Sequence, residues 1–243
     1  MVRFLHLSSS NYPYILVINL YCMLLFSLLF SYLPLIQQID KKHPVYVLDD
    51  GVMTSGRPFI FKSIDQVAAA CLPFVKTIAA KSNKKSSSVQ ITLAGWSYGG
   101  VVASAVAKLL SGDAQSGIEV KTLILFDSPL RAPKKTGEEA AGQVHSTAPI
   151  IDTGETHSSN GDDLQARTQA HFRACTDLLK DFYQQQQLNS NSENTTTSST
   201  SLLQCAVCDI RPKQTDYDCG LEAAAELTMG PAYRVMVPGT HWT

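Results

Sequence analysis

The feature that most constrains the fold is a short turn-forming motif, Gly-x-Ser-x-Gly, at residues 95–99. It follows the strand-like run 90–94 and leads directly into a helix-like run, Val101 to Leu110. A strand, a tight turn around Ser97 and a helix in immediate succession require small residues at positions 95 and 99, because a side chain there would collide with the neighbouring strand or helix. The stretch therefore predicts an α/β fold with Ser97 on a strained turn above the sheet.

The same context gives Ser97 a chemical role. In a nucleophile elbow, the turn lifts the serine hydroxyl clear of the sheet. It also directs the backbone N–H of Tyr98 and the N-terminus of the following helix toward the place where an oxyanion would form. We therefore expect Ser97 to be a nucleophile and Tyr98 to donate to the oxyanion. The alternative is a glycine-rich strand-to-helix turn that carries no chemistry.

The composition limits the classes of protein to which the chain can belong. With 243 residues it is long enough for one α/β domain with a complete core, so we expect a single domain over residues 1–243. The net charge is -1 and no basic patch with interleaved aromatic residues occurs, so nucleic acid is not an expected partner. The six cysteines are scattered, which argues against a disulfide scaffold and favours a reducing, cytoplasmic compartment.

The motif Cys205-x-x-Cys208 raises the question of a metal site. It has no second cysteine pair at zinc-binding spacing, and it lies in a strand-like run. We interpret both cysteines as core residues and expect no metal.

Residues 1–36 include an apolar segment, 14–36, that is long enough to span a bilayer. One interpretation is a membrane anchor or an uncleaved signal. The other is a buried strand, Tyr14 to Tyr21, followed by a helix. Because another strand-like run, Pro44 to Asp49, comes next, the second interpretation provides the strand–helix–strand unit that an α/β sheet needs, and we favour it slightly.

Further elements follow from local patterns. Ser63 and Gln66 form a capping-box pattern at the start of an amphipathic helix, and Pro73 should kink or split that helix. Val120 to Phe126 is a nearly continuous apolar run, which predicts a parallel strand covered on both faces. Nearer the C-terminus we expect a strand at 202–210, a short helix at 221–227 and a last strand at 233–237.

The region between these strands has a different composition. Residues 131 to about 163 are polar and rich in Gly, Ser and Thr. An amphipathic helix is expected from Gln165 to Tyr183. Residues 184–201 are rich in Gln, Asn, Ser and Thr, and this low-complexity stretch predicts a disordered loop.

A serine nucleophile needs a base, which is normally a histidine oriented by a carboxylate. Asp127 and His241 each follow an apolar strand, and the carboxyl ends of parallel strands meet at one edge of a sheet. The order Ser97, Asp127, His241 is that of the α/β-hydrolases. Three aspartates near the end of the next strand are rival acids: Asp209, Asp216 and Asp218. The other histidines do not follow strands and are interpreted as solvated or loop residues: His6, His43, His145, His157 and His171.

Four of these segments resemble the thioesterase domains that terminate nonribosomal peptide and polyketide synthases; fatty-acid synthase thioesterases are similar. They are the strand Pro44 to Asp49, the elbow at 93–103, the strand and acid at 124–129, and the turn Val237-Pro238-Gly239-Thr240-His241. The resemblance covers most of residues 32–130 and 202–243. It implies an α/β-hydrolase fold, with a mostly parallel sheet flanked by helices.

The resemblance also implies an activity. Ser97 would be the nucleophile, Asp127 the orienting acid and His241 the base of a serine thioesterase. The substrate would be an acyl or peptidyl thioester on the phosphopantetheine arm of a carrier protein, which makes the carrier protein the expected partner and requires no bound cofactor. Residues 131–201 occupy the place of the variable helical lid in that family.

Two departures keep alternatives open. The loop that carries the second oxyanion donor in that family is rich in glycine, whereas Cys22-Met23-Leu24-Leu25 contains none. Loss of one donor can lower the rate about a hundred-fold. The family also continues past the histidine with a helix, whereas this sequence stops at Thr243. A carboxylesterase or lipase that uses the same triad is one alternative. A catalytically impaired homologue that binds an acyl carrier is the other, in the cytoplasm or tethered to a membrane.

Overall fold

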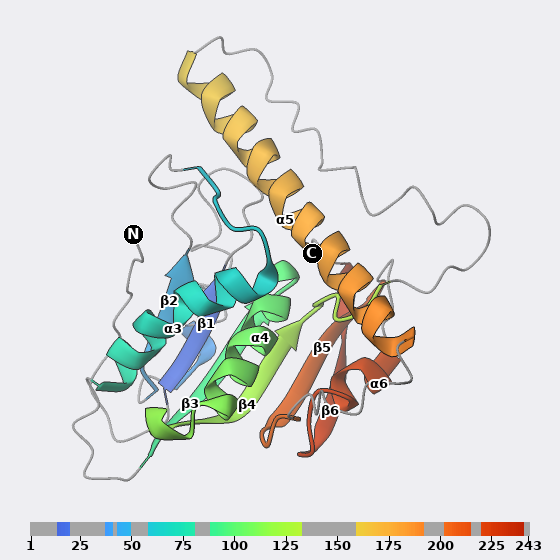
Figure 1. The fold of residues 1–243 in the computed structure, drawn as a ribbon. Helices are drawn as coiled ribbons and strands as arrows, with labels where there is room; N and C mark the ends of the chain where they lie inside the picture. The colour runs from blue at the N-terminus through green and yellow to red at the C-terminus, as the bar shows by residue number, and fades with distance from the viewer. Residues whose placement is uncertain are drawn as a thin grey trace.

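A six-stranded sheet, in which every pair of neighbouring strands is parallel, organises the fold (Figure 1). The computed structural model describes residues 14–19, 37–40, 43–49, 58–80, 88–132, 159–191, 202–214 and 220–240. The strand order is β2-β1-β3-β4-β5-β6. The strands are β1 (Tyr14–Asn19), β2 (Val45–Asp49), β3 (Val89–Trp96), β4 (Ile118–Phe126), β5 (Ala206–Gln214) and β6 (Ala232–Thr240). The predicted mostly parallel α/β architecture is confirmed.

The central strands are apolar because they are covered by helices. Leu93 on β3 and Leu123 and Leu125 on β4 are fully buried in the main core. Helices α3 (Ile64–Ala80) and α4 (Tyr98–Gly112) lie side by side over one face of the sheet (Figure 1). A parallel sheet in a domain of this size is stabilised chiefly by such burial, at roughly 25 cal/mol per Å² of apolar surface.

The start of α3 follows the predicted cap with one difference. The backbone N–H of Gln66 donates to Ser63 Oγ at 3.2 Å, as in a capping box. The Gln66 side chain, however, accepts from the backbone N–H of Lys62 at 2.9 Å. Both bonds satisfy N–H groups at the helix terminus that have no partner within the helix.

Pro73 does not split α3, and that part of the prediction is wrong. The helix continues through Pro73 to Ala80. Its stripe of buried side chains, which includes Val67, Cys71 and Val75, packs on both sides of the proline and holds the helix against the core. The hydroxyl of Thr77 donates to the Pro73 carbonyl at 2.7 Å.

The N-terminal apolar segment contributes a strand to the middle of the sheet. β1 pairs with β2 on one side and with β3 on the other. This confirms the strand of the folded interpretation for residues 14–19, while residues 20–36 lie outside the described residues. Among the helices that the structure describes, none has the length and apolar character needed to cross a membrane.

Helix α5 (Ser159–Asn191) is much longer than the helix predicted from Gln165 to Tyr183. It runs through the first part of the stretch expected to be a disordered loop, so that prediction is wrong for residues 184–191. Glutamine is a good helix former when its neighbours are already helical, which explains the extension. Residues 133–158 and 192–201 lie outside the described residues.

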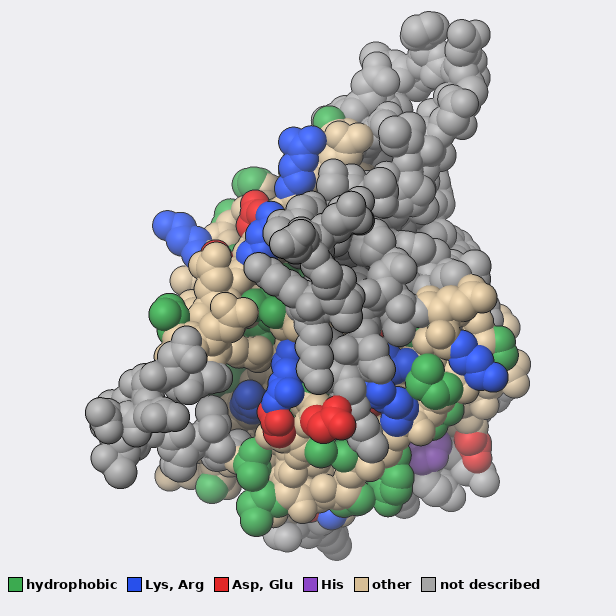
Figure 2. Space-filling view, turned by 90° about the vertical axis from the view of Figure 1, so that its right-hand side faces the viewer, with side chains coloured by type: hydrophobic (Ala, Val, Ile, Leu, Met, Phe, Trp, Pro, Cys, Tyr) green, Lys and Arg blue, Asp and Glu red, His purple; other side chains and the backbone are tan. Residues whose placement is uncertain are grey.

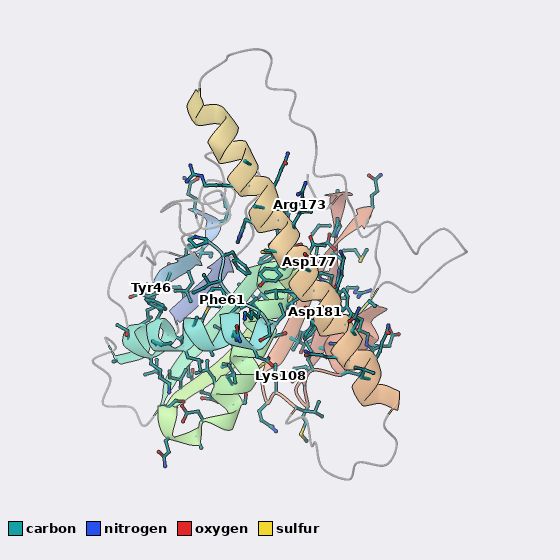
Figure 3. The ribbon with its side chains drawn as sticks, turned by 45° about the horizontal axis from the view of Figure 1, so that its top comes forward. Tyr46, Phe61, Lys108, Arg173, Asp177 and Asp181 are labelled. Atoms are coloured by element: carbon teal, nitrogen blue, oxygen red, sulfur yellow. The ribbon has the colours of Figure 1, made fainter. Side chains whose placement is uncertain are left out.

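One side of α5 is buried and the other is charged. Arg173, Asp177 and Asp181 follow one another along the exposed side (Figure 3). The buried side contributes His171, Cys175, Leu178, Leu179 and Tyr183. On the face of the molecule drawn in Figure 2, Lys and Arg side chains alternate with Asp and Glu, and the coloured side chains form no extended area of one sign.

The complete burial of Leu123 predicts the effect of a cavity in β4. Leu123→Ala should lower the free energy of unfolding by about 2–5 kcal/mol, because the removed methyl groups leave a void in a fully buried position. Leu188→Ala on α5 is the matched control, since the Leu188 residue is 69% exposed and alanine is a strong helix former. Urea unfolding followed by circular dichroism measures both; equal midpoints for the two variants would contradict the placement of β4 in the core.

Candidate active site

Ser97 occupies a strained turn between β3 and α4. It has φ 52° and ψ −125°, a conformation that side-chain-bearing residues rarely adopt, and it forms the N-cap of α4 without a capping side-chain bond. The residue is buried, at 4% exposure. A strained backbone at a serine that follows a strand and precedes a helix is the geometry expected of a nucleophile elbow.

Two glycines at this turn permit unusually close contacts with neighbouring atoms. A Cβ atom on Gly95 would collide with the carbonyl of Gly99 and lie 2.5 Å from the nitrogen of Gly100. A Cβ atom on Gly100 would collide with the side chain of Ser128, whose Cβ would lie 2.6 Å away. The requirement for a small residue at position 95 is confirmed, and Gly100 proves to be a second such position.

Asp127 occupies the equivalent position one strand away. It follows β4 directly, and at φ 43° it is the other non-glycine residue with positive φ in the part of the chain that the structure describes. The sheet hydrogen bonds continue past the strand ends to hold both residues. Ser97 N–H donates to the Phe126 carbonyl at 2.8 Å, and Asp127 N–H donates to the Ile210 carbonyl at 2.8 Å. The sheet thus brings the predicted nucleophile and the predicted acid to the ends of neighbouring strands.

The Asp127 carboxylate is buried in contact with a charged network. Arg211 on β5 donates from Nη1 to Asp127 Oδ1 at 2.9 Å. The same guanidinium donates from Nε to Asp209 Oδ1 at 2.9 Å. Arg234 on β6 donates to Asp209 Oδ2 from Nη2, also at 2.9 Å. Two carboxylates and two guanidiniums therefore balance in charge within the domain.

This network is not predicted by the sequence patterns. Its signal was the pair of charged residues, Asp209 and Arg211, in an otherwise apolar strand, since charged side chains are almost never fully buried unless they are paired. Asp209 was considered only as a rival acid, and the structure places it inside β5 between two arginines. The other rival acids, Asp216 and Asp218, lie outside the described residues.

The predicted base cannot be placed, because His241 lies outside the described residues. β6 ends at Thr240, the residue immediately before it. Since β6 is parallel to the other strands, it ends at the same edge of the sheet as β3 and β4.

The predicted oxyanion donor is partly placed. Tyr98 is the first residue of α4 and is fully buried, so its N–H lies at the N-terminal end of the helix, where the helix dipole favours a negative charge. Cys22 to Leu25, where a second donor was sought, lie outside the described residues.

One of the other histidines differs from expectation. His171 is neither solvated nor in a loop but is buried on α5, where its ring contacts Phe59 at a centroid distance of 5.1 Å. Its Nε2 lies 3.7 Å from Cys175 Sγ. His171 and Cys175 lie one helical turn apart on the apolar stripe of α5, which explains why both are buried.

Helix α5 is attached to the segment that follows Asp127. The hydroxyl of Tyr183 donates to the Pro129 carbonyl at 2.8 Å. Gln186 Nε2 donates to the Leu130 carbonyl at 3.2 Å. The helix predicted as part of a lid is therefore fixed within a few residues of the predicted acid.

The two cysteines of the Cys-x-x-Cys motif lie in or near the core. Cys205 is buried and Cys208 on β5 is half-buried, and burial raises the pKa of both thiols. Within the described residues, no group of three or more His, Cys, Asp and Glu side chains is arranged to hold a metal ion.

Comparison with known protein families decides the class of the protein. The family model described as "Thioesterase domain" matches residues 62–243, which include the elbow, the Asp127 position and the C-terminal strand. The chain belongs to the thioesterase domain family. It is accordingly a hydrolase that acts on thioester bonds. No curated protein matches this thioesterase in sequence.

Solved structures of similar fold include several enzymes of biosynthetic clusters. BorB, a type II thioesterase from the borrelidin cluster, is 15% identical with a TM-score of 0.60, over 98% of this chain and 90% of that chain. ClbQ from the colibactin NRPS/PKS pathway is 13% identical with a TM-score of 0.59, over 95% and 90%. RedJ, a thioesterase of the prodiginine pathway of Streptomyces coelicolor, is 17% identical with a TM-score of 0.58, over 97% and 83%. At these identities the similarity concerns the fold.

The close approach at the elbow can be tested with one methyl group. Gly95→Ala places a Cβ against the Gly99 backbone, which has no flexible end to move, so the free energy of unfolding should fall by about 1–3 kcal/mol. Gly112→Ala at the end of α4 is the control, because nothing lies within 4 Å of its Cβ position. Thermal unfolding would contradict the elbow geometry if both variants matched the unmodified protein.

Proposed function

We propose that this thioesterase releases acyl or peptidyl groups from the phosphopantetheine arm of a carrier protein, with Ser97 as nucleophile, His241 as base and Asp127 as orienting acid. The observation that carries the proposal is the strained Ser97 turn, held by a hydrogen bond to Phe126, the last residue of the strand before Asp127. Backbone strain of this kind costs about 1–3 kcal/mol and is concentrated at active sites.

In the first half of the reaction, Ser97 Oγ attacks the carbonyl carbon of the thioester while its proton passes to His241. The carbonyl oxygen becomes an oxyanion, which accepts a hydrogen bond from Tyr98 N–H at the start of α4. The C–S bond then breaks, and the thiolate of the phosphopantetheine arm takes the proton from the imidazolium. Asp127 stabilises that imidazolium and keeps the ring oriented.

In the second half, the acyl group is held on Ser97 as an oxygen ester. Water, or a nucleophile within the acyl chain, gives its proton to His241 as it attacks the ester carbonyl. The tetrahedral species collapses, and Ser97 Oγ leaves with the proton from the imidazolium. The products are a free acid or a cyclic product and the original enzyme.

The carrier protein is proposed from the chemistry of thioesters and from the solved structures of similar fold. By their descriptions, BorB is a type II thioesterase of the borrelidin biosynthetic cluster, and ClbQ belongs to the colibactin NRPS/PKS pathway. Phosphopantetheine enters as part of the substrate, so no cofactor of the enzyme itself is required. Helix α5, fixed to the segment after Asp127, is well placed to border the bound acyl chain and to select among chains.

Covalent labelling tests the nucleophile. A thioesterase domain of similar fold, NocB, forms a covalent complex with a fluorophosphonate analogue; it is 19% identical with a TM-score of 0.57, over 96% of this chain and 87% of that chain. Ser97→Ala should abolish fluorophosphonate labelling, detected by intact-protein mass. Ser104→Ala is the control, because that buried hydroxyl on the same helix bonds only the local Val101 carbonyl at 2.7 Å. Labelling that persisted in Ser97→Ala would refute the assignment.

A carboxamide in place of the acid tests the triad and the reaction. Asp127→Asn should lower kcat by about ten-thousand-fold, because the amide favours the wrong imidazole tautomer. The assay measures hydrolysis of acyl thioesters of N-acetylcysteamine, which mimic the end of the phosphopantetheine arm. Matched oxygen esters should be poorer substrates in kcat/KM; a preference for oxygen esters would instead indicate a carboxylesterase.

A further inference from the structure

We infer that Arg211 is a positioning residue for the proposed reaction, fixing the Asp127 carboxylate in the orientation that the imidazole needs. The inference rests on the proposed triad but adds a residue from β5 that sequence patterns did not single out. Arg211 is 1% exposed, on the strand next to β4. Its neighbour Ile210 accepts the backbone N–H of Asp127 at 2.8 Å, so side chain and backbone of the acid are held by consecutive residues.

The guanidinium holds the acid at two points. Nη1 donates to Asp127 Oδ1 at 2.9 Å, and Nη2 donates to the Ser128 carbonyl at 2.5 Å. One bond fixes the carboxylate and the other fixes the backbone immediately after it. Because the guanidinium is planar and its donors form a rigid fork, the two bonds together fix the rotation of the carboxylate about its side-chain bonds.

The Arg211 guanidinium is itself fixed by Asp209, through its Nε. Nε donates to both oxygens of Asp209, at 2.9 Å and 3.2 Å. Arg211 therefore lies between two buried carboxylates, and its position is determined before any substrate binds. Preorganised geometry of this kind is what a reaction with a one-ångström tolerance requires.

Asp209 and Arg234 complete the charged network around the acid. The carboxylate of Asp209 lies between the guanidiniums of Arg211 and Arg234, so the charge of Arg211 is shared between two carboxylates. A carboxylate accepts about four hydrogen bonds, so the bond from Arg211 to Oδ1 leaves capacity for an imidazole N–H.

Lysine at position 211 tests the orientation separately from the charge. Arg211→Lys keeps the cation but loses the fork, so kcat for thioester hydrolysis should fall about a hundred-fold while KM changes less than about three-fold. Arg131→Lys is the matched control, since the Arg131 side chain is 38% exposed and pairs with Glu226 at the surface; its kcat should stay within about two-fold of the unmodified protein. Circular dichroism and thermal unfolding establish that both variants are folded.

A double-mutant cycle separates a positioning role from a structural one. In the Asp127→Asn background, Arg211→Lys should lower the rate of Ser97 labelling by fluorophosphonate less than about three-fold. The carboxylate that Arg211 orients is absent from this background, so losing its orientation has little further effect. Equal fold-losses in both backgrounds would overturn the inference, as would an unchanged kcat in the single variant. If Asp127→Asn itself kept full activity, the proposed triad would fail instead.

A charge-balanced variant covers the case in which Arg211→Lys does not fold. Asp209→Asn with Arg211→Gln removes one negative and one positive charge together, and it keeps polar side chains of similar size that can still hydrogen-bond to Arg234 and Asp127. The inference predicts about the same hundred-fold loss of kcat in this folded variant. A double variant with unimpaired turnover would overturn it.

Discussion

The site depends on sheet hydrogen bonds that continue one residue past the strands. Ser97 and Asp127 both have positive φ, and each donates its backbone N–H to a carbonyl of the next strand, at 2.8 Å. The bonds compensate for conformations that side-chain-bearing residues otherwise avoid at a cost of about 1–3 kcal/mol. Trp96 pairs with Phe126, and Phe126 pairs with Ile210, in adjacent strands of the parallel sheet. The register of these three residues therefore fixes the positions of Ser97 and Asp127 at the edge of the sheet.

The charged network beside Asp127 places an unusual demand on the fold. Removal of one partner from a buried ion pair costs about 3–5 kcal/mol, a large share of the stability of a domain. The four charges are provided by β5, β6 and the turn after β4, so each of these three parts of the chain leaves a buried charge uncompensated unless the others are in place. The network thereby links correct pairing at one end of the sheet to the placement of the acid.

Local patterns predicted the parts of the structure that local physics decides. The apolar runs became strands, Ser63 caps α3, and Gly95 is required by the backbone of Gly99. The position of Asp127 after its strand also followed from sequence, since parallel strands end at a common edge. Where tertiary packing decides, the patterns left the outcome open: Pro73 was expected to kink or split α3, and the helix is not split because residues on both sides of the proline pack on the core.

The contact between Arg211 and Asp127 joins positions that are distant in sequence, and no periodicity encodes it. The attachment of α5 is of the same kind and has a practical consequence. Tyr183 and Gln186 hold the helix to the Pro129 and Leu130 carbonyls, so a substitution at either position would loosen the helix and the segment after Asp127 together. A mutagenesis screen of α5 would therefore also collect variants in which that distant segment has shifted.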